Sequence, residues 1–276
     1  ASVNKDPFVL EAREIRGVVS NGMLASPSEL GLFEDHDGIL EIDEHDATPG
    51  QAFKELYGLD DVVIDIENKM FTHRPDCFGV LGVARELAGI TGQQFKSPDW
   101  YLQGELSTMH ERDVELDITV ATDLVSRFLV VAMKHVEVSS SPIWLQTALT
   151  RVGLKPINNI VDITNYLMYV TGQPLHAYDA DKLPVKNTLG ARMSKRGEKV
   201  NLLNGKQLEL QDDQAVVITS GDTVVGIGGV MGGKDTEVSA ETKNIIIECA
   251  SFDMYNIRRT SMKYGLCTDA VTRFTK

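Results

Sequence analysis

The sequence predicts an α+β fold: a small β-barrel remnant and a helical connector, followed by a larger mixed domain of mostly antiparallel strands. Three observations indicate this class. Apolar and polar residues alternate with the period of strands over the first forty residues, and a segment with helical spacing follows at 73–92. From Gly190 to Glu248, short apolar runs are separated by Gly, Asn and Asp turns, as in a succession of strands.

The chain has 276 residues, enough for two domains with a real core. We place the barrel remnant, too short to close by itself, at 1–45 and the connector at 46–110. The larger domain then occupies 111–276. A polar, aperiodic linker at 96–113 sets the second boundary near residue 110.

In the connector, the alternating pattern of residues 60–70 predicts a strand. The helix predicted at 73–92 has Asp76 as its cap, after Pro75, and ends at Gly92.

The larger domain begins with two predicted strands, at 114–120 and 127–138. Helical spacing and cap residues then predict three helices: one capped by Ser141 with Pro142 at its first position, one at 158–172 ending at Gly172, and one at 253–265. Between the last two, Asn204-Gly205 predicts a hairpin over 197–210, and the apolar run 244–252 predicts a strand buried on both faces.

Composition limits the classes of function. Nearly all of the net charge of −13 lies in residues 1–110, so we expect no high-affinity nucleic-acid binding by this chain alone, and any RNA contact should come through the nearly neutral second part. The three cysteines are far apart in the sequence, which disfavours disulfides or a zinc site and favours a reducing cytoplasm. We expect all three to be buried as small apolar residues.

No apolar run approaches the roughly 20 residues that a membrane helix needs. The first residues lack both a starting methionine and the basic and apolar regions of a signal peptide, which suggests a processed or excised chain.

A glycine-rich stretch at 226–238 raises the question of a nucleotide site. Gly228 to Lys234 has the G-x-x-x-x-G-K spacing of a phosphate-binding loop. Asp235 stands where that motif needs Ser or Thr, and the residues around the stretch predict a hairpin and a turn where the motif needs a parallel strand and a helix. Two interpretations stay open: a tight crossing of packed strands, or room for a ligand to approach the backbone.

Four segments occur in an order that is informative: 158–183, 229–233, 245–252 and 265–274. Together they resemble the B3/B4 editing region of the bacterial phenylalanyl-tRNA synthetase β-subunit family. Residues 13–32 resemble the end of that family's tRNA-binding, OB-like barrel, and 60–92 resemble its connecting region. The larger domain is therefore expected to be of the B3/B4 type.

The resemblance implies that the chain is a fragment of a cytoplasmic β subunit. Its partners would be an α subunit and tRNA(Phe), with tyrosine or phenylalanine as the aminoacyl group and no membrane. It implies hydrolysis of mischarged Tyr-tRNA(Phe) here. ATP and Mg²⁺ would serve ligation elsewhere in the synthetase, with no cofactor in this fragment. Two alternatives stay open: a non-catalytic scaffold or tRNA-contacting module, and a free-standing nucleotide hydrolase that rests on the Gly228–Lys234 spacing alone.

The resemblance also assigns site residues. Glu248 matches the glutamate that accepts the tyrosine phenol, and His176 matches the editing histidine, which would position the terminal ribose or the attacking water. Thr268 completes the predicted catalytic set. The predicted substrate contacts are Gly232, Ala270, Thr164, Asn165 and Asn159. Asn159 stands where some relatives carry an arginine, so a cationic contact to the RNA end is not expected here.

Overall fold

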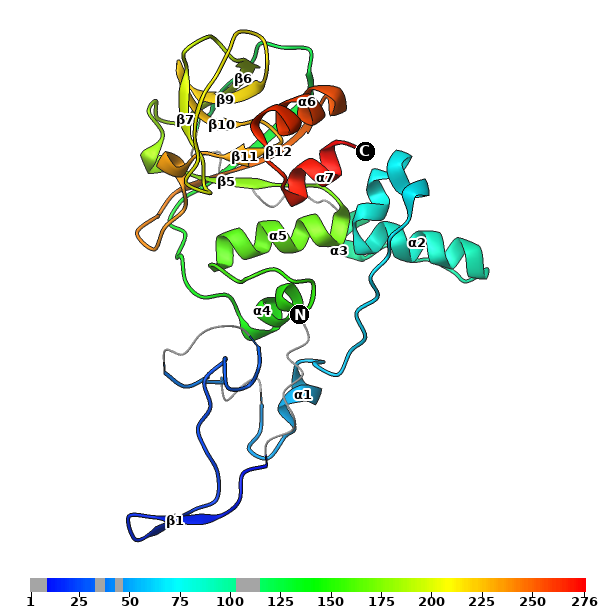
Figure 1. Ribbon diagram of the computed structural model, residues 1–276, viewed down its shortest axis with the longest axis vertical. Helices are drawn as coiled ribbons and strands as arrows, with labels where there is room; N and C mark the ends of the chain where they lie inside the picture. The colour runs from blue at the N-terminus through cyan, green and yellow to red at the C-terminus, as the bar shows by residue number, and fades with distance from the viewer. Residues whose placement is uncertain (1–8, 33–37, 43–46, 103–114) are drawn as a thin grey trace. The chain divides into compact units, whose positions relative to one another are not determined.

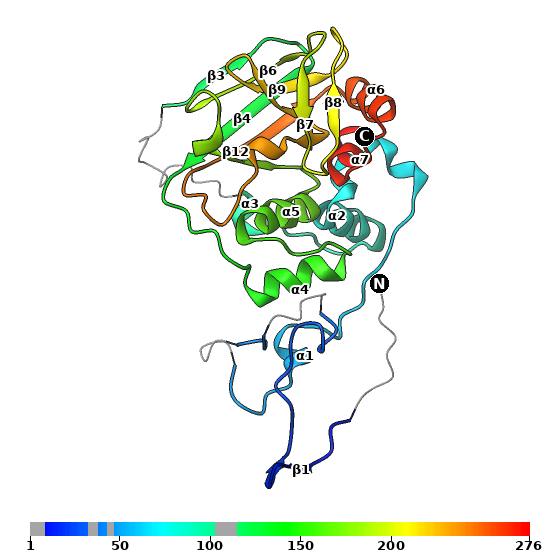
Figure 2. The same cartoon turned by 60° about the vertical axis from the view of Figure 1, so that its left-hand side comes forward.

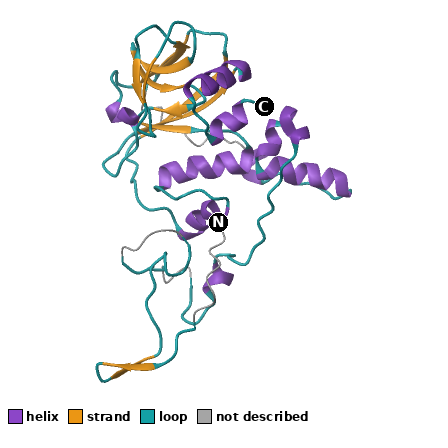
Figure 3. Cartoon of the chain, in the orientation of Figure 1, coloured by secondary structure: helices purple, strands orange, loops and turns teal. Residues whose placement is uncertain are grey.

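The computed structural model describes residues 9–32, 38–42, 47–102 and 115–276. The chain forms two compact units: a first unit, Ala1–Ile66 with Ser141–Ile157, and a second unit, Glu67–Ser140 with Asn158–Lys276. The units do not separate at residues 45 or 110, and the three-domain division of the sequence stays a prediction. The α+β class is confirmed, since helices and mostly antiparallel strands occupy separate segments (Figure 3).

The first unit contains a short hairpin and two short helices in its described residues. Strands β1 (Arg13–Ile15) and β2 (Val18–Ser20) pair antiparallel. Between them, Arg16 and Gly17 have positive φ angles of 53° and 83°, the backbone that favoured two-residue hairpin turns require. The helices are α1 (Phe53–Leu56) and α4 (Ile143–Arg151). No closed barrel forms in this part of the chain, as far as the structure describes it.

The prediction of a strand at 60–70 is wrong. Residues 61–68 have no regular structure, and the side chains of Val62 and Ile64 are 78% and 76% exposed. Alternation gives a segment two faces, but a strand forms only where a neighbour pairs with its N–H and C=O groups. Among the described residues no strand pairs with this segment, nor with 38–42 in the predicted barrel remnant.

The helix predicted at 73–92 begins later than expected. Two 3-10 helices, Lys69–His73 and Pro75–Phe78, precede α2 (Val80–Thr91), whose N-cap is Gly79. Asp76 caps nothing; its carboxylate instead forms an ion pair with Arg74, with 2.9 Å between Arg74 Nε and Asp76 Oδ1. The end of α2 at Gly92 is confirmed, with a positive φ of 68°. A short helix, α3 (Asp99–Leu102), follows.

In the described residues of the second unit, two sheets and a hairpin form the β part. The five-stranded sheet has the order β11-β10-β9-β6-β3 and is antiparallel except between β3 and β6. Its strands are β3 (Asp117–Val120), β6 (Thr188–Met193), β9 (Val216–Ser220), β10 (Thr223–Ile227) and β11 (Met231–Gly232).

The three-stranded sheet has the order β4-β12-β5 and is antiparallel throughout. Its strands are β4 (Val125–Met133), β5 (His176–Asp179) and β12 (Ile245–Phe252), and β4 lies beside β12 in Figure 2. β12 is the central strand, which confirms the strand predicted at 244–252. Burial on both faces is not complete, because Ile247, Cys249 and Ser251 are half-buried. A separate hairpin, β7 (Lys199–Asn201) with β8 (Gln207–Glu209), turns at Asn204-Gly205 as predicted.

The two sheets pack face to face. Tyr178 of β5 and Ile246 of β12 lie in one buried cluster with Leu189, Val216 and Ile218 of the five-stranded sheet. Successive residues of a strand point to opposite faces, so the even-numbered residues of β5 and β12 point towards the five-stranded sheet.

The outer faces of both sheets are covered by helices. α5 (Asn159–Thr171) runs along the outer face of the three-stranded sheet, beneath β5 in Figure 1. Two more helices, α6 (Met254–Tyr264) and α7 (Asp269–Phe274), pack with the β7–β8 hairpin on the five-stranded sheet. They share a buried cluster with Val217 of β9 and Val224 of β10. The predicted ends of α5 and α6 are confirmed, because Gly172 and Gly265 have the positive φ angles of helix C-caps, 81° and 61°.

Two smaller predictions are wrong, and one helix was not predicted. α4 has Pro142 as its N-cap and no side-chain cap, so the prediction for Ser141 is wrong. Of the free cysteines, Cys77 is buried, but Cys249 is half-buried and Cys267 is exposed. α7 has no counterpart among the predicted elements.

In the described ranges, no helix combines the length and apolar character that crossing a membrane requires.

A pair of glycines on α2 tests the packing of this helix. A Cβ at Gly82 would lie 1.9 Å from the backbone oxygen of Asp76, whereas a Cβ at Gly89 would meet no atom within 4 Å. We expect Gly82→Ala to destabilise the chain by about 1–3 kcal/mol because the backbone must move. Gly89→Ala should stabilise it by about 0.5–1 kcal/mol through helix propensity. Urea unfolding of both variants checks this, and equal effects would contradict it.

Candidate functional site

The glycine-rich stretch is a hairpin. β10 and β11 pair antiparallel, with Gly226 opposite Gly232, and a 3-10 helix of 3 residues, Lys234–Thr236, follows. Lys234 forms an ion pair with Glu237. A phosphate-binding loop needs a parallel strand before it and a full helix after it, so the hairpin does not have the geometry of a triphosphate site.

The glycines of this hairpin are required by close packing. A Cβ at Gly228 would lie 2.9 Å from Phe252 Cε1, and one at Gly229 would lie 2.7 Å from Ile257 Cδ1. At Gly232 the neighbour is the imidazole of His176, with Cε1 at 2.3 Å and Nε2 at 2.4 Å from the Cβ position. The tight-crossing interpretation therefore holds for Gly228 and Gly229, and the space beside Gly232 is filled by His176.

A pocket lies between this hairpin, β5, β12 and α7. Its empty volume is about 460 Å³, part of it open to solvent. Apolar side chains form most of the wall: Ile218, Ile227, Met231, Phe252 and Phe274. Among the lining residues the titratable side chains are those of His176, Tyr178 and Glu248, so polar recognition in the pocket depends on these three.

Strand pairing brings the three polar side chains together. In the register of β5 and β12, Glu248 is directly opposite His176, and Ile246 is opposite Tyr178. Because residues two apart point to the same face, all three polar side chains point to the pocket side of the sheet, away from α5.

The Glu248 carboxyl is buried and hydrogen-bonded. Glu248 is 6% exposed, and the Tyr178 hydroxyl donates to its Oε2 at 2.6 Å. Burial disfavours the charged form and raises the pKa of Glu248 to about 7, while the hydrogen bond from Tyr178 acts in the opposite direction. Burial and the adjacent carboxylate raise the pKa of Tyr178 well above its usual value. Near neutral pH, Glu248 is therefore poised between its two forms, and Tyr178 keeps its proton.

His176 is a neutral side chain near pH 7. Its ring meets that of Tyr178 edge to face, with 4.5 Å between the centroids. His176 keeps some accessible surface, but the surrounding protein desolvates the ring and lowers its pKa to about 4. A neutral imidazole can accept a hydrogen bond through one nitrogen, which a protonated ring cannot.

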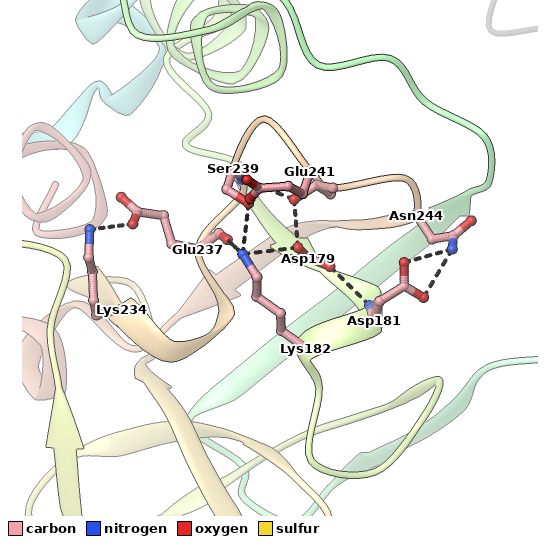
Figure 4. A network of polar contacts seen from close by, with 9 residues as sticks. Asp179, Asp181, Lys182, Lys234, Glu237, Ser239, Glu241 and Asn244 are labelled. Atoms are coloured by element: carbon pink, nitrogen blue, oxygen red, sulfur yellow. Dashed lines mark hydrogen bonds and ion pairs between the residues drawn. The ribbon is translucent and has the colours of Figure 1, made fainter.

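A polar network behind β5 holds this arrangement in place (Figure 4). Asp179, 2% exposed, accepts a hydrogen bond from Thr242 at 2.5 Å and lies 3.2 Å from Lys182 Nζ. Lys182 also donates to the backbone oxygen of Glu237 at 2.8 Å and to Ser239 Oγ at 2.9 Å. The network ties the segment between β11 and β12 to β5, and so fixes Gly232 relative to His176.

Comparisons with known proteins place the chain in a family. The family model described as "B3/4 domain" matches residues 124–276. The chain belongs to the B3/4 domain family.

The chain is also similar to proteins named phenylalanine–tRNA ligase β subunit. It is 44% identical over 267 residues to that of Moorella thermoacetica, covering 95% of this chain and 32% of the relative. To that of Carboxydothermus hydrogenoformans it is 39% identical over 272 residues, covering 98% and 33%. To that of Thermotoga maritima it is 37% identical over 268 residues, covering 97% and 33%. The chain thus spans about a third of the length of these curated relatives.

The solved structures that match include an N-terminal fragment of the phenylalanyl-tRNA synthetase β subunit of Pyrococcus horikoshii. It is 14% identical with a TM-score of 0.36, covering 70% of this chain and 58% of the fragment. At that TM-score the match adds nothing to the family assignment.

The B3/4 domain brings together four of the predicted site residues, since His176, Glu248, Gly232 and Ala270 all line the pocket. Thr268 lies beside it as the N-cap of α7: its Oγ1 accepts from Val271 N at 3.1 Å and donates to Val230 O at 2.9 Å. Thr268 thus ties α7 to the glycine hairpin, which places Ala270 in the wall. The assigned roles stay predictions.

The three remaining predicted residues lie on α5 and do not line the pocket. Thr164 is buried and donates to the backbone oxygen of Val161 at 2.7 Å, and Asn165 is half-buried. Asn159 donates to the backbone oxygen of Glu137 at 2.9 Å, so it joins α5 to the segment after β4. Contact of these residues with a substrate stays a prediction.

Sequence reasoning missed Tyr178 and the aromatic wall made by Phe252 and Phe274. The signal for Tyr178 was present, because a residue two positions after His176 on a strand must share its face.

Across the ranges that the structure describes, no group of His, Cys, Asp and Glu side chains is arranged to hold a metal ion.

Replacing Glu248 by Gln should change how stability depends on pH. The folded-state pKa of about 7 lies above the ordinary glutamate pKa of 4.5, so the stability that Glu248 contributes is present below pH 4.5 and is lost as pH rises through 7. Wild type should therefore lose roughly 3 kcal/mol relative to Glu248→Gln between pH 4.5 and 7. Urea unfolding across this range measures it, and parallel curves would contradict the burial of an ionising carboxyl. His176, whose pKa is lowered, contributes stability that is lost as pH falls. This contribution is present in both proteins, so it cancels when their free energies of unfolding are compared.

Proposed function

We propose that the second unit hydrolyses the ester of mischarged Tyr-tRNA(Phe), as the editing region of a phenylalanine–tRNA ligase β chain. The observation that carries this proposal is the buried Glu248 carboxyl in the wall of a pocket whose other side chains are mostly apolar. The names of the relatives, with which almost the whole chain aligns, support its place in a phenylalanine–tRNA ligase β chain. They also support the α subunit and tRNA(Phe) as partners, with ATP and Mg²⁺ acting in the complete synthetase.

Selection of tyrosine follows from hydrogen-bond satisfaction. Glu248 Oε1 accepts no hydrogen bond from the described residues, and a tyrosyl phenol entering the pocket can donate to it. A phenylalanyl side chain has no donor and leaves this acceptor unpaired, at a cost of about 1–3 kcal/mol. The pocket therefore prefers the amino acid that a phenylalanine ligation site has most difficulty excluding.

Such a site answers a limit of binding specificity. An apolar pocket shaped for phenylalanine rejects an analogue with one added hydroxyl by a factor of only about a hundred. A second site that requires the hydroxyl raises the total discrimination, because it removes the product that the first site accepts in error.

The chemistry assigned to the pocket is attack of a positioned water on the aminoacyl ester. His176, neutral at physiological pH, is placed to accept a hydrogen bond from that water or from the terminal ribose. Two backbone N–H groups near Gly232, those of Val230 and Gly233, donate within the hairpin at 3.0 and 2.8 Å and so are not available to an oxyanion of the ester. This leaves a ribose hydroxyl of the RNA as the stronger candidate for assistance.

The test uses the full-length β chain in its synthetase. Glu248→Ala should lower Tyr-tRNA(Phe) deacylation about 10-fold to 100-fold, because a hydrogen bond to a charged group is lost. His176→Ala should lower it by a similar factor, and both variants should form Phe-tRNA(Phe) at the normal rate. Glu209→Ala, on the exposed face of β8, is the matched control for Glu248→Ala.

Unchanged deacylation in both site variants would refute the proposal. It would favour a non-catalytic, tRNA-contacting role for this region.

A further inference from the structure

The hydroxyl of Tyr178 takes part in none of the roles assigned to the site above. This side chain is 1% exposed, and its ring packs in the cluster between the two sheets with Leu189 and Ile218. Its hydroxyl reaches out of that cluster to Glu248 Oε2 at 2.6 Å. A buried tyrosine usually has a hydrogen-bond partner for its O–H. Here the partner is Glu248, the residue that the proposed function assigns to substrate recognition.

The Glu248 carboxyl presents two different oxygens as a result. Oε2 is engaged by Tyr178. Oε1 accepts no hydrogen bond from the described residues, and it is not among the described side-chain atoms that are both sealed from solvent and unpaired. The free oxygen therefore belongs to the accessible part of a residue that lines the pocket.

Tyr178 cannot leave when a substrate binds. Its ring is fixed by core packing, and moving it would open a cavity between the sheets at a large cost. A substrate phenol must then share the carboxyl with Tyr178, with one phenol on each oxygen, and cannot displace it.

We propose that Tyr178 is a specificity-positioning residue, whose hydroxyl holds Glu248 Oε2 so that Oε1 faces the pocket to accept the phenol of a tyrosyl ester. The proposal rests on the proposed function and adds to it the residue that aims the recognition group. Tyr178 acts through Glu248 and does not touch the reacting ester.

The same bond sets the charge of Glu248. A carboxylate accepts a phenol hydrogen bond more strongly than a neutral acid does. Burial raises the pKa of Glu248 to about 7 and the Tyr178 hydroxyl lowers it, so losing the hydroxyl moves this pKa upward. The groups facing Glu248 are His176 and Tyr178 from β5, Val130 opposite it on β4, and the uncharged hairpin and α7 residues of the pocket wall. No charge contributes to the shift.

The experiment compares wild type, Tyr178→Phe and Tyr169→Phe in the full-length β chain within its synthetase. Deacylation of Tyr-tRNA(Phe) and Phe-tRNA(Phe) is measured from pH 5.5 to 8.5, after subtraction of uncatalysed hydrolysis. Tyr169→Phe is the matched control, since its hydroxyl also donates to a carboxylate, Asp269, at 3.1 Å, but does not line the pocket.

For Tyr178→Phe we expect kcat/KM for Tyr-tRNA(Phe) to fall about five- to tenfold, with kcat/KM for Phe-tRNA(Phe) unchanged. The acid limb of the Tyr-tRNA(Phe) profile should move to higher pH. Tyr169→Phe should match wild type in both readouts. If the role of Tyr178 were purely structural, kcat/KM would fall for both substrates together and the acid limb of the pH profile would stay in place.

A second variant tests the proposal even if Tyr178→Phe fails to fold. Site-specific Tyr178→3-fluorotyrosine keeps the ring and strengthens the phenol as a donor, so the acid limb should move to lower pH, opposite to Tyr178→Phe.

Normal selectivity and an unmoved acid limb in both variants, with active wild type, would overturn the role of Tyr178 and leave the proposed function standing. No deacylation by wild type would overturn both.

Discussion

The hydrogen bond between Tyr178 and Glu248 is the interaction on which the site depends. It exists because β5 and β12 pair in a register that puts Glu248 opposite His176 and diagonal to Tyr178. A slip of one residue would turn Glu248 to the α5 side of the sheet and remove the polar group from the pocket. The apolar residues around Glu248 in β12 resist that slip, since Ile246 and Ala250 are buried on the same face.

The pocket and the core are continuous. Phe252 lines the pocket, packs edge to face on Phe274 with 5.2 Å between the ring centroids, and fills the space that Gly228 and Gly229 leave free. The glycine hairpin therefore gives the pocket its shape through packing, and it binds no phosphate in this account. Behind β5, the network centred on Asp179 holds the segment that returns the chain from the hairpin to β12 (Figure 4).

Much of the second unit could be predicted from local sequence. The C-cap at Gly172, the turn at Asn204-Gly205 and the buried strand β12 each depend on residues close together in the chain. The helix ends needed a residue that tolerates positive φ, and the turn needed two residues with known hairpin preferences.

The errors concern partners distant in the sequence or competing side chains. Residues 60–70 alternate like a strand, but no described strand pairs with them. Asp76 binds Arg74 where a helix cap was expected. The resemblance to a family supplied His176 and Glu248, but the bond from Tyr178 needed the register of β5 and β12 to be known.

The most direct measurement is a pair of crystal structures of the chain, one with L-tyrosine and one with L-phenylalanine. The account predicts tyrosine between Glu248 and the glycine hairpin, with its phenol oxygen about 2.5–3.0 Å from a carboxyl oxygen of Glu248. Phenylalanine should leave the pocket empty at the same concentration. Tyrosine bound with its phenol turned away from Glu248, or phenylalanine bound equally well in the same pose, would contradict the account.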